Sequence, residues 1–160
     1  MISIVKILFV FILTISSSIG QIQFEAKSIE GNQISLESLL ENGPVLLNFW
    51  ATWCQPCKAE IKHLKSIYEK YKSTGFTIVG INQDSPKSLS KVKSFISSYM
   101  VGYPVVLDPN NQIFQKFNGQ VVPYSLLINK SGEIEYKHTG YLPGDEIELE
   151  EEIKMLLNAK

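Results

Sequence analysis

The chain has 160 residues, of which 15 are lysine or arginine and 16 are aspartate or glutamate, giving a net charge of −1. This nearly neutral balance gives no sign of nucleic-acid binding. Only two cysteines are present, so the pair is better suited to working chemistry than to scaffolding.

Residues 1–20 have the layout of a secretory signal peptide. Lys6 precedes an apolar run over residues 7–15, and small residues follow up to an expected cut between Gly20 and Gln21. The apolar run is shorter than the roughly 20 residues that span a bilayer. No cysteine lies near the cut, which excludes a lipoprotein anchor. The alternative is an N-terminal membrane anchor that is not cleaved.

Residues 21–160 are expected to form one domain. This length allows a proper hydrophobic core, and no repeat, low-complexity segment or linker divides it. Export would place the domain in the periplasm or outside the cell, which are oxidising compartments.

The domain begins with two short extended segments, residues 24–28 and 33–35. They flank the turn signal Glu30-Gly31-Asn32 and predict a hairpin. Ser35 can then cap a short helix that runs through Leu40. The following apolar run, residues 45–50, predicts a buried strand.

The segment Trp53-Cys54-Gln55-Pro56-Cys57 lies between that strand and an amphipathic helix. The helix is indicated by apolar positions at steps of four and three: Cys57, Ile61, Leu64, Tyr68 and Tyr71. A helix N-terminus stabilises a thiolate through free N–H groups and the helix dipole. Cys54, nearest the open end, is therefore predicted to be the nucleophile. Cys57, on the apolar face, is predicted to be the less exposed, resolving thiol.

Three other interpretations of the cysteines compete with this one. A structural disulfide would close a very short loop and would gain little entropy. A zinc site needs about four ligands, and only His63 and His138 could join the cysteines as strong ligands. The third alternative is two unrelated core cysteines. The two histidines are otherwise interpreted as ordinary surface residues.

The residues Asn48-Phe49-Trp50-Ala51-Thr52-Trp53-Cys54-Gln55-Pro56-Cys57-Lys58-Ala59-Glu60 resemble the active-site stretch of thioredoxin-like proteins. The closer resemblance is to their exported TlpA/ResA-type branch. It extends in outline from about Phe24 to the C-terminus and is strongest around the cysteines. Trp53 is expected to cover the site and to contact substrate, whereas Trp50 is expected in the core.

Glu60 lies three residues after Cys57, so the two share a helix face. One interpretation is an exposed helical glutamate, and the other is a half-buried carboxylate that exchanges protons with Cys57. The resemblance favours the second, because TlpA/ResA-type proteins have a glutamate at the matching place. Asn48 strengthens it, since cytosolic thioredoxins carry an ionisable aspartate there and asparagine cannot take a proton.

The rest of the chain alternates strands and helices. Strands are predicted over residues 76–82, 104–107, 124–128 and 134–138. Helices are predicted from Asp84-Ser85-Pro86, around residues 113–117, and from Asp145 with a buried face that includes Ile147, Leu149 and Ile153. This order predicts an α/β sandwich around a mixed sheet. The resemblance implies a thioredoxin-like three-layer sandwich with helices flanking the sheet, an N-terminal hairpin, and a strand–helix insertion between Pro86 and Phe117.

Pro123 follows Val122 and precedes a predicted strand. An X–Pro bond is cis in only about 5–6% of cases, but the resemblance implies a cis proline packed beside the disulfide. There it would keep the backbone at Val122 and Pro123 free to pair with a substrate strand. The family usually has threonine after this proline, and Tyr124 at that position puts the partner-binding surface in doubt.

The sequence and the resemblance together predict an exported protein-disulfide reductase with a Cys54/Cys57 dithiol–disulfide cycle. It needs no cofactor and no metal, acts on disulfide-containing exported proteins, and receives electrons from a membrane thiol donor, with a possible place in cytochrome c maturation. A monomer is expected. The alternatives are an oxidase or isomerase of exported proteins, and a copper-handling thioredoxin-like module. A peroxidase is disfavoured by the cysteine spacing.

Overall fold

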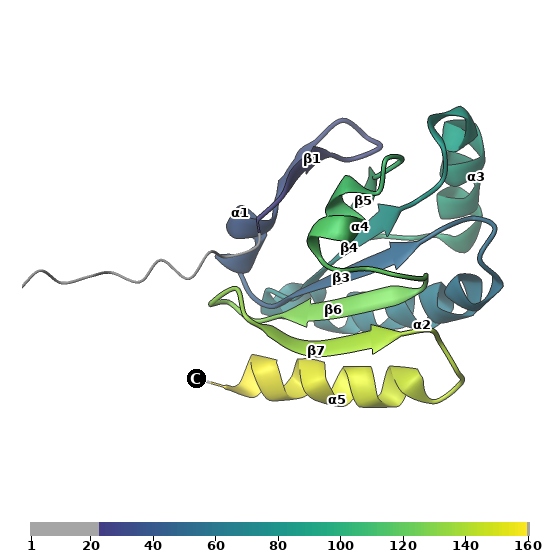
Figure 1. The fold of residues 1–160 in the computed structure, drawn as a ribbon. Helices are drawn as coiled ribbons and strands as arrows, with labels where there is room; N and C mark the ends of the chain where they lie inside the picture. Colours follow the sequence, from purple (N-terminus) through teal and green to yellow (C-terminus); the bar gives the residue numbers. More distant parts are fainter. Residues whose placement is uncertain (1–22, 160) are drawn as a thin grey trace, which may run out of the picture.

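The computed structural model describes residues 23–159 (Figure 1). The strands are β1 (Glu25–Lys27), β2 (Gln33–Ser35), β3 (Val45–Trp50), β4 (Thr77–Asn82), β5 (Val105–Leu107), β6 (Tyr124–Ile128) and β7 (Ile134–Thr139). The helices are α1 (Leu36–Leu40), α2 (Gln55–Tyr71), α3 (Leu89–Tyr99), α4 (Gln112–Lys116) and α5 (Asp145–Asn158), with 3-10 turns η1 (Lys72–Thr74) and η2 (Pro86–Ser88). The predicted order of elements is confirmed.

Strand β3 is the centre of a five-stranded mixed sheet with the order β5-β4-β3-β6-β7. It runs parallel to β4 and antiparallel to β6, and every one of its residues is buried. Covering a strand on both faces requires an uninterrupted apolar run, which is what residues 45–50 supply apart from Asn48. The exception marks the place where polar chemistry enters the core.

Two hydrophobic cores lie on the two faces of the sheet. One is formed with residues of α2, α3 and α5 and includes Leu46, Trp50 and Ile61. The other is formed with α1, α4 and the β1–β2 hairpin and includes Phe49 and Phe117. Figure 1 shows α4 in front of the sheet and α2 behind it. The three-layer sandwich with its N-terminal hairpin is therefore confirmed.

The predicted insertion comprises α3, β5 and α4. Strand β5 extends the sheet beyond β4 as an edge strand. Ser28, which follows β1, forms a β-bridge with Val106 of β5. Helix α3 covers Trp50, whose ring lies 4.9 Å from that of Phe95. The insertion thus encloses the tryptophan that ends the central strand, and Trp50 is in the core as expected.

The prediction for Ile147 is wrong, because this side chain is 61% exposed on α5. Leu149 and Ile153 are buried and stand four residues apart. At 3.6 residues per turn, a residue two positions before Leu149 points to the opposite side of the helix. Ile147 is an apolar residue on the outer face.

Within residues 23–159, no helix combines the length and apolar character needed to cross a bilayer. The predicted signal peptide, residues 1–20, lies outside the described residues.

Candidate active site

Cys54 and Cys57 lie where the central strand passes into helix α2. Cys54 is the N-cap of the helix, and its Sγ accepts a hydrogen bond from the backbone N–H of Cys57 at 3.2 Å. Both are buried, Cys54 being 4% exposed and Cys57 fully enclosed. The predicted order of exposure is confirmed. A sulfur at this position faces the positive end of the helix dipole, which favours its thiolate form.

The two cysteines are joined by a disulfide bond, with their Cα atoms 5.3 Å apart. The interpretation of two unrelated core cysteines is therefore wrong. Among residues 23–159, no group of three or more histidine, cysteine, aspartate or glutamate side chains is placed to hold a metal ion.

Glu60 is buried on the same face of α2, one turn after Cys57, with 5% of its surface exposed. Its Oε2 accepts a hydrogen bond from Asn48 Nδ2 at 2.8 Å, and its Oε1 accepts one from Ser125 Oγ at 2.9 Å. Asn48 Nδ2 also donates to Ser125 Oγ at 3.0 Å. The carboxylate is more deeply buried than the predicted half-buried group, and the exposed alternative is wrong.

Burial raises the pKa of Glu60 from 4.5 to about 7. The low-polarity surroundings disfavour the charged form, and this effect outweighs the hydrogen bonds from Asn48 and Ser125, which lower the pKa. The negative charge of Asp145 raises it further. A carboxyl group with this pKa can both accept and release a proton near neutral pH.

The Val122–Pro123 peptide bond is cis, as the resemblance implies. Because Tyr124 pairs with Phe49 in the β3–β6 ladder, Pro123 lies at the end of the sheet where β3 leads into the cysteine motif. Pro123 is buried, Val122 is partly buried, and the neighbouring Val121 is exposed.

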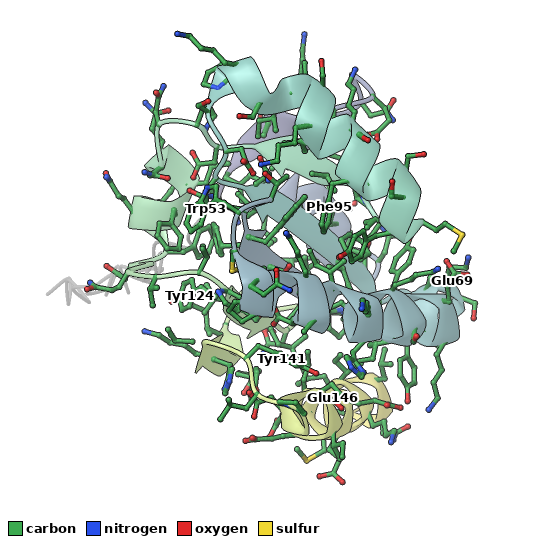
Figure 2. All side chains as sticks on the ribbon, turned by 90° about the vertical axis from the view of Figure 1, so that its right-hand side faces the viewer. Trp53, Glu69, Phe95, Tyr124, Tyr141 and Glu146 are labelled. Atoms are coloured by element: carbon green, nitrogen blue, oxygen red, sulfur yellow. A yellow bond between two sulfur atoms is a disulfide. The ribbon has the colours of Figure 1, made fainter. Side chains whose placement is uncertain are left out.

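Trp53 is an exposed aromatic residue beside the cysteines, with 65% of its surface accessible. Figure 2 shows it at the surface near the start of α2, above Tyr124 in this view. This exposure makes the side chain available to a binding partner, while its covering of the disulfide remains a prediction.

The side chain of Tyr124 does not lie at the surface, so it does not bear on partner binding as expected. Its side chain is buried in the core on the far side of the sheet, where its hydroxyl donates to the Phe117 carbonyl at 2.9 Å. Successive residues of a strand point to opposite faces, so Ser125 rather than Tyr124 faces Glu60. Tyr124, where the family usually has threonine, therefore contributes to core packing.

Asp84 belongs to the site although no sequence pattern indicates it. This buried aspartate accepts hydrogen bonds from the backbone N–H and the hydroxyl of Thr52, both at 2.7 Å, and from Asn82 Nδ2 at 2.8 Å. It fixes the loop that leads to Cys54 against the end of β4. The pattern Asp84-Ser85-Pro86 predicts only a helix start, because a contact across 32 residues leaves no local signal.

The histidines lie at different distances from the surface. His63 is half-exposed on α2, with Nδ1 3.7 Å from Glu146 Oε1. His138 lies on β7 with its Nε2 2.9 Å from Asp145 Oδ2, and 29% of its side chain is exposed. Both are exposed or partly exposed, which agrees with the interpretation as surface residues, and His138 is in addition paired with Asp145.

Comparison with known proteins places the site in a family. Residues 21–137 match the AhpC/TSA family. Thiol-disulfide oxidoreductase ResA of Halalkalibacterium halodurans is 34% identical over 119 residues, which are 74% of this chain and 66% of that protein. ResA of Bacillus subtilis is 38% identical over 117 residues, 73% of this chain and 64% of that protein. The matches span about two thirds of the length of these relatives.

Solved structures that resemble this fold are also thiol-disulfide exchange proteins by their names. A proposed thiol:disulfide interchange protein DsbE from Chlorobium tepidum superposes with a TM-score of 0.78 and 28% identity, covering 85% of this chain and 94% of that one. A proposed protein disulfide isomerase from Bacteroides thetaiotaomicron gives 0.76 and 31%, covering 84% and 86%. The chain therefore belongs to the AhpC/TSA family, and within it to the thioredoxin-like thiol-disulfide oxidoreductases of the ResA type.

Proposed function

We propose that this chain reduces disulfide bonds in exported proteins. The observation that carries the proposal is the buried Glu60 carboxyl group on the same helix face as Cys57, behind a nucleophile at a helix N-terminus. The Cys54 thiolate attacks a partner disulfide and forms a mixed disulfide. Cys57 then attacks Cys54, releases the partner as a thiol, and closes the Cys54–Cys57 bond.

Glu60 moves the proton that this cycle requires. A thiol enclosed in apolar surroundings resists ionisation, and Cys57 must lose its proton before it can attack. Glu60 accepts that proton and returns it when the disulfide is reduced again. Asn48 and Ser125 hold the carboxylate in place through their hydrogen bonds.

The partner surface is proposed to include Trp53, Val122 and Pro123. Trp53 offers an exposed aromatic ring, and the backbone at Val122 and Pro123 lies at the same end of the sheet as the cysteines. An extended segment of the partner would pair there. The resemblance to ResA-type proteins suggests haem-site thiols of apocytochromes as one substrate class, with electrons supplied by a membrane thiol donor.

The reduction potential of the Cys54/Cys57 pair tests the direction of the reaction. Equilibration with glutathione should give a value near that of thioredoxin, about −270 mV, and reduced protein should reduce insulin. A value near about −120 mV would identify an oxidase instead. Titration of the reduced protein with Cu(I) tests the copper-handling alternative, which tight binding would support.

The place of action is proposed to be extracytoplasmic, from the pattern of residues 1–20. Mass spectrometry of the protein from its native host should find a mature chain that begins near Gln21. An intact Met1 in the membrane fraction would indicate the anchored form.

A further inference from the structure

The enclosure of Glu60 raises the question of how its proton reaches water. The side chain is 5% exposed, and each of its oxygens is covered by a buried partner, Asn48 or Ser125. An amide such as that of Asn48 does not take up a proton in this pH range. The hydroxyl of Ser125 can both donate and accept, so it is the partner through which a proton can pass.

Ser125 is paired with His138 on the neighbouring strand. The two residues are opposite each other in the β6–β7 ladder, so their side chains share the face of the sheet that Glu60 covers. Side chains of such a pair have Cβ atoms about 4.5–5.5 Å apart. A single water molecule is large enough to bridge such a separation between two polar side chains.

His138 is held at the edge of the site by Asp145. The distance from His138 Nε2 to Asp145 Oδ2 is 2.9 Å, and the same oxygen accepts the backbone N–H of Leu142 at 2.7 Å. The side chains of His138 and Asp145 are 29% and 26% exposed, so the pair reaches solvent. An imidazole ring has two nitrogens, so it can accept a proton at one and release a proton from the other.

The second histidine near Glu60 is less suited to this role. His63 is one turn after Glu60 on α2, but it is exposed while Glu60 is buried. Its contacts are with Glu146 and with the ring of Tyr141, whose centroid is 6.0 Å from its own. Figure 2 places Tyr141 and Glu146 between α2 and α5. Neither residue is a hydrogen-bond partner of Glu60.

We propose that Ser125 and the His138–Asp145 pair form the route by which Glu60 exchanges protons with solvent. This inference rests on the proposed function of Glu60. His138 and Asp145 act through Glu60 and do not touch the reacting sulfur atoms. Other ionisable groups surround the route, and they are His63 on α2, Tyr136 on β7, Tyr141 in the next loop, and Glu146, Glu148 and Glu152 on α5.

The proton balance of the resolving step is simple. The S–H bond of Cys57 breaks and its proton moves to Glu60, while the Cys57 sulfur attacks the Cys54 sulfur. The bond between Cys54 and the partner breaks, and the partner sulfur leaves with the electron pair and takes a proton from solvent. Glu60 then passes its own proton through Ser125 and His138 to water. Reduction of the pair reverses these transfers.

The substitution His138→Gln tests the route. It keeps a hydrogen-bond donor for Asp145 and removes the ring nitrogen that would relay the proton, and His63→Gln is the matched control. Reduced full-length protein is mixed with glutathione disulfide, and conversion of the mixed disulfide to the Cys54–Cys57 disulfide is followed by rapid quenching between pH 5 and 9. We expect His138→Gln to slow this step about threefold to tenfold, less than Glu60→Gln, with an unchanged thermal midpoint. His63→Gln should match the unaltered protein.

Two further measurements separate a proton route from a structural role. In a Glu60→Gln background, His138→Gln should cause no additional slowing. His138→Ala should regain rate when imidazole is added to the buffer, because free imidazole can carry the proton.

The possible failures can be told apart. If Glu60→Gln leaves the rate unchanged, the proposed function of Glu60 is wrong. If Glu60→Gln slows the step but His138→Gln does not, or if His138→Gln slows both backgrounds equally, the route is wrong and the role of Glu60 stands.

Discussion

The side-chain amide of Asn48 donates a hydrogen bond to Glu60 Oε2 at 2.8 Å, and this contact joins the central strand β3 to the active-site helix α2. Asn48 is fully buried, so the bond forms where water does not compete. It keeps the carboxyl group on the Cys57 side of the helix. The contact accounts for a polar residue in the most buried strand of the sheet.

Glu60→Gln should slow disulfide exchange, because the variant keeps the shape of the side chain and cannot move a proton. Proton-transfer assistance contributes about 10²–10⁴-fold in enzymes, and we expect the low end because thiols exchange without it. Insulin reduction and thiolate absorbance between pH 5 and 9 measure the effect. Glu69→Gln, an exposed change on the same helix, is the control. If the pH curves of Glu60→Gln coincide with those of the unaltered protein, solvent and not Glu60 carries the proton.

Glu60→Gln should also change how the free energy of unfolding depends on pH. The folded protein keeps the Glu60 proton up to a pKa of about 7, whereas the unfolded chain releases it near 4.5. The folded state therefore binds more protons between these values, and its stability falls as pH rises through this window. The loss amounts to about 3 kcal/mol at pH 8.

Urea denaturation of the oxidised protein at pH 5 and pH 8 checks this prediction. Glu60→Gln should be less sensitive to pH than the unaltered protein and should gain relative stability at pH 8. Glu69→Gln should retain the original dependence. Parallel losses in the Glu60 variant and the unaltered protein would contradict the raised pKa.

The two cysteines should behave differently when each is replaced. Cys57→Ser should accumulate mixed disulfides with partner proteins, because no thiol remains to release the partner from Cys54. Cys54→Ser should trap far fewer, since Cys57 is fully enclosed. Non-reducing electrophoresis after acid quenching measures the trapped complexes. Equal trapping by both variants would reverse the assignment of the nucleophile.

Asp84→Ala should impair both stability and exchange. It removes the acceptor of the Thr52 N–H and hydroxyl groups, at a cost of about 1–3 kcal/mol for each buried donor left unpaired. The loop before Cys54 loses its attachment to β4, so the nucleophile is held less firmly. Urea denaturation and single-turnover reduction of glutathione disulfide measure the two effects.

Asp108→Ala is the matched control for this prediction. Asp108 is equally buried and accepts the backbone N–H groups of Ile113 and Phe114 at 3.1 and 2.8 Å, at the start of α4. Its loss should destabilise the protein without altering the exchange rate of the folded form. If both variants slow exchange to the same extent, the effect of Asp84 is general destabilisation.

The sequence predicted the elements that depend on local patterns. The apolar run before the motif, the spacing from Cys57 to Tyr71 and the turn at Asn129 to Gly132 define their strands and helix without long-range information. The fold class and the cysteine pair follow from them and from the family resemblance. The position of Glu60 on the helix face of Cys57 can be predicted from the sequence. The depth of its burial cannot.

The missed features all depend on contacts between distant segments. Ser125 reaches Glu60 across 65 residues, and Asp84 reaches Thr52 across 32. The orientation of Tyr124 depends on the register of β6 with β3, because a shift of one residue would exchange its face with that of Ser125. No local pattern carries this information.

Both ends of the described chain lie at the end of the sheet away from the cysteines (Figure 1). Gln23 and Ala159 line two neighbouring cavities that share Lys130, and one of these also includes Pro44, the residue before β3. Strand β3 has six residues, which span about 20 Å at 3.3 Å each, so the sulfur atoms are remote from either attachment point. A tether, a solid support or a fused protein joined at either end would leave the opposite end of the sheet, where the cysteine motif lies, open to an approaching partner.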